Sequence, residues 1–223
     1  MNVYSLIKPL GAFFVVMGAL IMVGWVTNIQ LLKVLVPGTG VASFPTAFSI
    51  FLSGLILRSF YRLCVGEKQG DSMVRIMASA VLLLLIFFPI FVGYFWNIDV
   101  GLDTFFEPVT VNGVEKQSFI PSVGSLLSIG AMLLMTFAVS TGHSITKVSR
   151  WGGIVLLTVG GLALVGYALQ DESLYFVTPT NTGMAFRAAF SFALSGAAFI
   201  ALGVRPHTEH QPAEGERAHA PQK

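Results

Sequence analysis

Long apolar stretches alternate with short polar ones along most of this chain, and the apolar stretches have the length of membrane spans. A helix needs about 20 mainly apolar residues to cross the hydrocarbon core of a bilayer. Six stretches meet this length, and they lie at residues 9–28, 44–63, 74–96, 120–141, 151–170 and 184–203. The pattern therefore predicts an all-α integral membrane protein with six transmembrane helices.

A small set of residues recurs along the chain. The first copy holds Gly24, Trp25, Asn28, Pro37, Ser49 and Gly54, and 142 positions later stand Gly166, Tyr167, Gln170, Pro179, Ser191 and Gly196. A middle copy, with a longer insert, holds Gly93, Tyr94, Asn97, Pro108, Ser125 and Gly130. Fixed spacing indicates internal repeats, so we expect three tandem helical hairpins at about residues 9–63, 74–141 and 151–203. Each hairpin crosses twice, which makes the copies parallel around an axis along the membrane normal.

The segments between the spans carry further predictions. Three apolar runs that are too short to span, at 29–36, 102–106 and 174–177, are expected to lie at the membrane interface as short helices or extended segments. The run Val109–Glu115 contains Asn112-Gly113 between alternating apolar residues, which predicts a small β-hairpin. Residues 204–223 are polar and proline-containing, which predicts a disordered tail.

The basic residues predict the orientation of the chain in the membrane. Ten of them flank one set of span ends: Lys8, Arg58, Arg62, Lys68, Arg75, Lys147, Arg150, Arg205, Arg217 and Lys223. The first, third and fifth connections hold only Lys33, Lys116 and Arg187, together with six acids. Because Lys and Arg are enriched in cytoplasmic loops, we expect both termini in the cytoplasm and these three connections outside.

Composition agrees with a membrane protein. The chain of 223 residues is 54% hydrophobic and 11% charged, whereas soluble domains carry about 25% charged residues. The lipid bilayer is therefore the expected environment, and we expect no nucleic-acid partner. The single cysteine, Cys64, excludes an intramolecular disulfide.

The polar residues that recur in the three copies are candidates for a ligand site near the outer face. They are the carboxamides Asn28, Asn97 and Gln170 and the serines Ser49, Ser125 and Ser191. Carboxamides past a helix end also cap carbonyl groups, and serines also hydrogen-bond between membrane helices. Packing and capping therefore stand as the alternative to ligand binding.

Arg187 and the aromatic residues near the outer boundary extend this candidate site. Arg187 is expected to bind an anionic ligand, to snorkel to the interface or to pair with an acid, for which Asp99, Asp103, Asp171 and Glu172 are candidates. Trp25, Tyr94, Trp96 and Tyr167 have the positions of an interfacial aromatic belt. The alternative for these aromatic residues is a hydrophobic ligand such as a quinone or a lipid.

Catalytic chemistry has little support in the sequence. His143, His207, His210 and His219 lie at a span end or in the tail, so bis-histidine haem ligation is not expected. Nucleotide-binding, zinc-protease and serine-hydrolase motifs are missing. We therefore expect a protein that is not an enzyme, with no catalytic residue, no metal and no cofactor.

The run Pro-Thr-Ala-Phe-Ser-Ile-Phe-Leu-Ser-Gly-Leu at 45–55, after an odd span ending in Gly24-Trp25, resembles the N-terminal membrane sensor regions of bacterial histidine kinases and diguanylate cyclases. The stretch Ile98–Asp103 is similar to a Gly-Ile/Leu-Asp motif of their second outer loop. The resemblance implies a multi-span input module in a bacterial inner membrane. The stretch after Gly203 is too short for the output domain of that family. We therefore expect the output to come from another chain.

Together these features predict a membrane sensor-like or scaffold subunit. It would bind a hydrophobic ligand, a lipid, or a partner membrane or cytoplasmic protein, using its outer half for ligand and membrane partner. Two alternatives stay open: an auxiliary subunit of a larger membrane enzyme or electron-transfer complex, and a small transporter. Transporters usually carry functional charges deep in their spans, and the six stretches show none at mid-span.

Overall fold

Six long helices make up most of the protein. The computed structural model describes residues 3–33, 42–67, 69–96, 109–111, 114–116, 121–171, 174 and 184–204. The long helices are α1 (Val3–Val26), α3 (Phe44–Val65), α4 (Gln69–Trp96), α5 (Val123–Ser140), α6 (Ile145–Leu169) and α7 (Phe186–Gly203). All six are long and apolar enough to cross a membrane. The prediction of six apolar helices of membrane-spanning length is thus confirmed, and these helices indicate a multi-pass membrane protein.

Three helices begin earlier than the apolar stretches suggested. Helix α1 continues through Pro9, and α4 and α6 include polar turns before their apolar runs, which start near residues 74 and 151. A helix does not have to stop where the hydrocarbon core stops, because water satisfies backbone groups beyond it. Hydropathy therefore located the spans but not their polar first turns.

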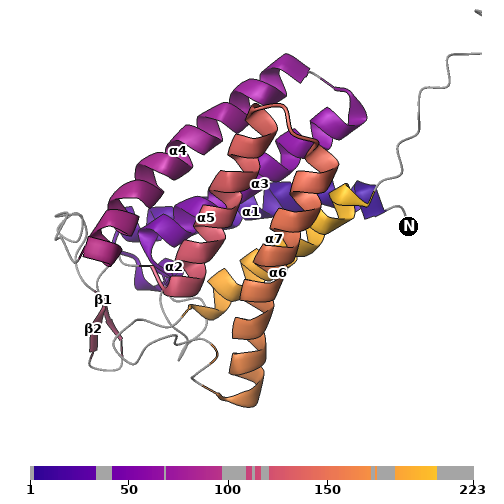
Figure 1. Cartoon of the computed structure of the whole chain (residues 1–223). Helices are drawn as coiled ribbons and strands as arrows, with labels where there is room; N and C mark the ends of the chain where they lie inside the picture. The colour runs from indigo at the N-terminus through magenta and orange to yellow at the C-terminus, as the bar shows by residue number, and fades with distance from the viewer. Residues whose placement is uncertain are drawn as a thin grey trace, which may run out of the picture.

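The helices alternate in direction, so that α1 begins and α7 ends at the same end of the bundle (Figure 1). We call this the basic end, because Arg58, Arg62, Arg75, Lys147 and Arg150 lie on its helix turns. The opposite end is the aromatic end, where α1, α4 and α6 finish with Trp25, Tyr94, Trp96 and Tyr167.

Helices α3, α5 and α7 contact one another and form the interior, whereas α1, α4 and α6 pack around them. The inner helices are the more buried ones, with α7 the most buried and α4 the least. Phe60 of α3 and Phe199 of α7 meet edge to face there, with ring centroids 5.7 Å apart. The centre of the bundle is therefore filled by side chains.

Glycines bring two helix pairs into close contact. A Cβ added to Gly54 of α3 would lie 2.5 Å from the Gly11 carbonyl oxygen of α1. One added to Gly196 of α7 would lie 2.7 Å from the Gly153 carbonyl oxygen of α6. Both pairs of positions are 142 residues apart. Small residues allow membrane helices to pack backbone against backbone, and α1/α3 and α6/α7 share this contact at corresponding positions.

The third pair, α4 and α5, is packed differently. A Cβ added to Gly130 of α5 would meet the ring of Phe87 of α4 at 3.2 Å, and its described neighbours include no backbone atom of α4. The contact between α4 and α5 is correspondingly less extensive than those of α1/α3 and α6/α7. A phenylalanine ring of α4 thus packs against this glycine of α5, whereas in the other two pairs a glycine packs against backbone atoms of the facing helix.

The helix ends follow local capping chemistry. Helix α3 starts after Ser43 with Pro45 in its first turn and ends at Gly66, which has φ +80°. Proline suits a first helical turn, and a left-handed glycine suits a C-terminal cap. Ser122 is the N-cap of α5, and its hydroxyl accepts a hydrogen bond from the Ser125 N–H.

The connections at the aromatic end contain short elements (Figure 1). Helix α2 (Gln30–Lys33) follows α1 and lies within the predicted segment 29–36. Strands β1 (Val109–Val111) and β2 (Val114–Lys116) pair antiparallel. Val111 faces Val114 across the Asn112-Gly113 position, which confirms the predicted β-hairpin. The segment 102–106, most of 174–177 and the tail after Val204 lie outside the described residues.

Candidate ligand-binding site

An apolar groove of about 750 Å³ runs along one face of α5, between α4 and α6. From α5 come residues at helical spacing, among them Val123, Leu126, Gly130 and Leu134. The outer walls come from the last turns of α4 and from the first half of α6. On the α4 side of the groove, the Phe87 ring packs against Gly130 of α5.

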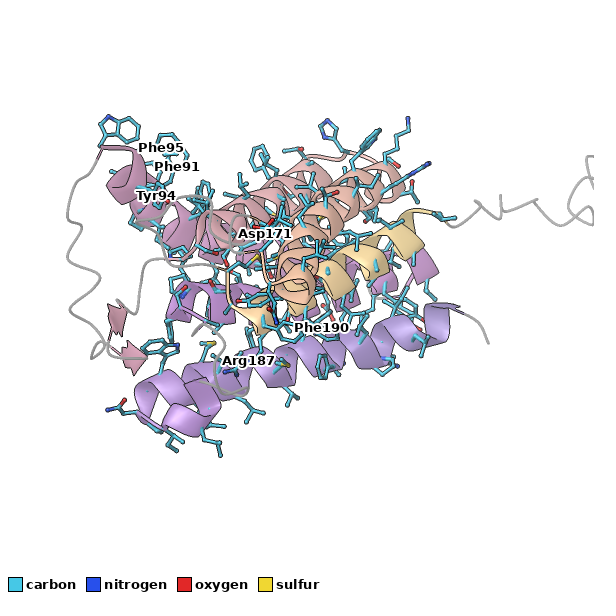
Figure 2. The ribbon with its side chains drawn as sticks, turned by 90° about the horizontal axis from the view of Figure 1, so that it is seen from below. Phe91, Tyr94, Phe95, Asp171, Arg187 and Phe190 are labelled. Carbon is cyan, nitrogen blue, oxygen red and sulfur yellow. The ribbon has the colours of Figure 1, made fainter. Side chains whose placement is uncertain are left out.

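Aromatic side chains form the α4 wall. Phe87, Phe91 and Phe95 are four residues apart and therefore share one helix face. The Phe87 and Phe91 ring centroids lie 5.4 Å apart, and those of Phe91 and Phe95 lie 4.4 Å apart. Figure 2 shows Phe91, Tyr94 and Phe95 gathered near the end of α4, away from Arg187 and Phe190 of α7. This wall offers ring faces and edges to an apolar ligand.

The α6 wall adds the one charge among the lining residues. Lys147 lies in the first turn of α6 at the basic end of the groove, and Trp151 follows one turn later. Both side chains are exposed. The groove therefore combines a long apolar surface with a single cation at one end. Ligand pockets typically show this combination of apolar walls and few polar groups.

Two of the three predicted carboxamides lie at helix C-termini in a left-handed conformation. Asn28 has φ +57° at the end of α1, and Gln170 has φ +55° at the end of α6. Both side chains are exposed. Asn is among the residues that adopt the left-handed conformation of helix C-terminal caps, and Gln170 does so here. Asn97 lies outside the described residues, so the predicted threefold set of carboxamides stays a prediction.

The predicted serines lie in the buried first halves of α3, α5 and α7. The Ser49 hydroxyl donates to the Pro45 carbonyl oxygen at 2.7 Å, and the hydroxyls of Ser122 and Ser125 are 3.0 Å apart. These hydrogen bonds stay within one helix and its cap. The Ser191 hydroxyl is buried without a hydrogen-bond partner among the described atoms. The structure thus shows the serines in helix packing and shows no hydrogen bond that links Ser49 to Ser125.

When the helices are aligned by their N-cap residues, a different serine of the middle copy corresponds to Ser49. Ser122 holds the N-cap position of α5 and Ser43 that of α3, which makes Ser128 the counterpart of Ser49. The Ser128 hydroxyl donates to the carbonyl oxygen four residues earlier, as the Ser49 hydroxyl does. The spacing of the short motifs pairs Ser49 with Ser125 instead, because the insert before α5 hides the helix register.

Arg187 is buried at the start of α7, with 4% of its surface exposed. Its Nη1 donates to the Leu32 carbonyl oxygen of α2 at 3.2 Å. Arg187 therefore joins α7 to the segment that follows α1. Among the acids predicted to pair with Arg187, Asp171 has an exposed side chain. Asp99, Asp103 and Glu172 lie outside the described residues. The predicted ion pair therefore stays a prediction.

Two of the predicted boundary aromatic residues form hydrogen bonds from the end of one helix to the residues just before its paired helix. The Trp25 indole N–H donates to the Ala42 carbonyl oxygen at 3.0 Å, and the Tyr167 hydroxyl donates to the Met184 carbonyl oxygen at 2.6 Å. Donor and acceptor positions are again each 142 residues apart. Trp96 is exposed at the end of α4. Of the predicted site residues with described side chains, Tyr94 is the one that lines the groove.

Sequence reasoning missed the remaining groove residues. The four-residue spacing of Phe87, Phe91 and Phe95 in an apolar span was a usable signal, as were the small residues Gly130 and Gly152 on the facing helices. Among the described residues no three His, Cys, Asp or Glu side chains are grouped as a metal site. Comparisons with protein families, curated proteins and solved structures give no match to this chain.

Proposed function

We propose that this protein is a non-enzymatic, sensor-like membrane subunit that binds a hydrophobic ligand from the bilayer in the groove along α5. The groove itself carries the proposal, because its volume of about 750 Å³ falls within the range of small-molecule sites, about 300–1,000 Å³. The resemblance to bacterial sensor regions supports a signalling role in a bacterial inner membrane. The output would pass to a separate protein at the basic end.

We further propose that α1/α3 and α6/α7 are two copies of one hairpin and that α4/α5 is a divergent third. Support comes from features 142 residues apart: the glycine contacts, the bonds made by Trp25 and Tyr167, and the left-handed Asn28 and Gln170. Divergence of the middle pair removed the close glycine contact and made room for a ligand. A duplicated scaffold would thus have acquired one binding hairpin.

The basic end is proposed to face the cytoplasm, with the chain ends on that side. The excess of Lys and Arg there supports this orientation. Cysteines introduced one at a time at His143 and Gln170, in a Cys64→Ser background, test it, since both side chains are exposed at opposite ends. A membrane-impermeant thiol reagent added to intact cells should label position 170 and spare position 143. The reverse pattern would invert the proposed orientation.

Ligand binding is proposed to act by shifting α4 relative to α5. A ligand changes a conformational equilibrium only as far as it binds one state better. Helix α4 makes fewer contacts with α5 than the paired helices of the other two hairpins make with each other. Occupation of the groove would favour the arrangement in which α4 stands apart. The α3–α4 connection at the basic end would carry this shift toward the partner protein.

Filling the groove tests the proposal. Ala131 lines the groove on α5 and is partly buried, so Ala131→Phe places a ring inside it. Native mass spectrometry of protein gently extracted from its own membranes should show a bound small molecule on the wild type and at least a tenfold lower occupancy on the variant. The loss follows because the added ring occupies space that the ligand needs.

Ala78→Phe provides the matched control, since Ala78 is exposed on α4 and does not line the groove. This variant should keep the ligand. Equal occupancy in wild type and Ala131→Phe, or a wild type that carries no small molecule, would remove the proposal. A stoichiometric partner protein on a ligand-free chain would instead favour the scaffold or auxiliary-subunit alternative.

A further inference from the structure

We infer that the ligand of this groove is an anionic glycerophospholipid, with its phosphate at Lys147 and its acyl chains against α5. This inference rests on the proposed function and adds the chemical class of the ligand. The groove matches such a molecule in its distribution of charge. Lys147 at one end suits the phosphate, and the remaining, almost wholly apolar lining suits the acyl chains.

The position of Lys147 suits a phosphate at the membrane surface. It is the third residue of α6 and its side chain is exposed, while Val148, Trp151 and Val155 continue the groove toward the interior. Lysine side chains extend to the interface and keep their charge in water. Trp151 is 69% exposed, and indole rings favour the headgroup level of a bilayer.

Charge around the groove agrees with an anion. No acidic residue lies in the first turn of α6 or lines the groove. The described acids of the basic end, Glu67 and Asp71, lie on the α3–α4 connection and at the start of α4. Cytoplasmic leaflets contain anionic lipids that Lys and Arg attract. The proposed orientation places Lys147 at that leaflet.

A partner helix would fit into the groove only in part. A membrane-spanning helix about 30 Å long and 10 Å wide displaces roughly 2,400 Å³, about three times the cavity of about 750 Å³. Much of such a helix would protrude from the groove. Flexible acyl chains, in contrast, can follow the uneven surface between the α4 rings and the α5 side chains.

Quenching of Trp151 by brominated lipids tests the inference. The protein is reconstituted into phosphatidylcholine vesicles that contain either brominated phosphatidylglycerol or brominated phosphatidylcholine, and the same measurement on Trp151→Phe isolates the Trp151 signal. We expect phosphatidylglycerol to be preferred about fivefold at Trp151. Lys147→Gln should abolish this preference. Arg75→Gln removes the same charge from the basic end of α4, outside the groove lining, and should keep it.

The outcomes separate this inference from the proposed function. If both lipids quench Trp151 equally and Ala131→Phe removes this quenching, the inferred preference for an anionic headgroup is wrong. The groove would then remain a hydrophobic site. A preference that survives Lys147→Gln would also overturn the role of Lys147. Protection of Trp151 from both lipids would indicate a protein occupant or a closed groove, and both proposals would then fail.

Discussion

Two adjacent glycines in α6 face different surroundings. A Cβ on Gly160 would lie 2.5 Å from the Ala193 backbone nitrogen and 2.6 Å from the Ala189 carbonyl oxygen of α7, whereas one on Gly161 would meet nothing within 4 Å. At Gly160 the contact is with backbone, which cannot rotate away. Gly160 therefore sets the distance between α6 and α7, and Gly161 leaves it unaffected.

Gly160→Ala should lower the free energy of unfolding by about 1–3 kcal/mol, the usual effect of overpacking. Gly161→Ala should be neutral or stabilise by up to about 1 kcal/mol, because alanine is the better helix former. Thermal unfolding in a mild detergent measures both. Gly18→Ala should behave like Gly160→Ala, since its Cβ would meet the Phe51 backbone. Equal stability of the Gly160 and Gly161 variants would contradict the described α6/α7 contact.

The hydrogen bond from Arg187 links two elements that are far apart in the sequence. It joins the start of α7 to the Leu32 carbonyl oxygen of α2, across 155 positions of sequence. A four-residue helix is too short to be stable alone. Helix α2 therefore depends on such contacts with the bundle for its position.

Replacing the guanidinium should release α2. Hydrogen bonds to charged groups contribute about 1.5–3 kcal/mol, so Arg187→Gln should speed amide hydrogen exchange in residues 29–33 by about tenfold or more. Exchange in the middle of α6 should change little. The control is Arg150→Gln, whose side chain is exposed. Unchanged exchange of α2 in the Arg187 variant would show that other contacts hold it.

At the scale of elements, the sequence predicted the spans well and the site poorly. Each span follows from about 20 apolar residues, and the β-hairpin follows from Asn112-Gly113. The groove depends instead on how α4, α5 and α6 pack against one another. Where α4 meets α5, the Phe87 ring packs against Gly130, and the spacing of short motifs does not report such a contact. The described members of the recurring polar set lie at helix ends and in helix packing, so their spacing does not predict the groove.

At the scale of the whole molecule, three helix pairs surround a filled interior, and they differ in how tightly they close. Close glycine contacts hold α1 to α3 and α6 to α7, while the α4/α5 pair borders an apolar groove. Tight pairs resist rearrangement because packed interiors are nearly incompressible. Movement on ligand binding is therefore expected at α4 and not at the other two pairs.

The most direct measurement of the central claim is an experimental structure of the wild-type protein in lipid nanodiscs, enlarged with a rigid antibody fragment for electron cryomicroscopy. The account predicts elongated non-protein density along α5, bounded by Phe91 on one side and Trp151 on the other. A groove closed by direct backbone contact between α4 and α5, or filled by a helix of another chain, would contradict it.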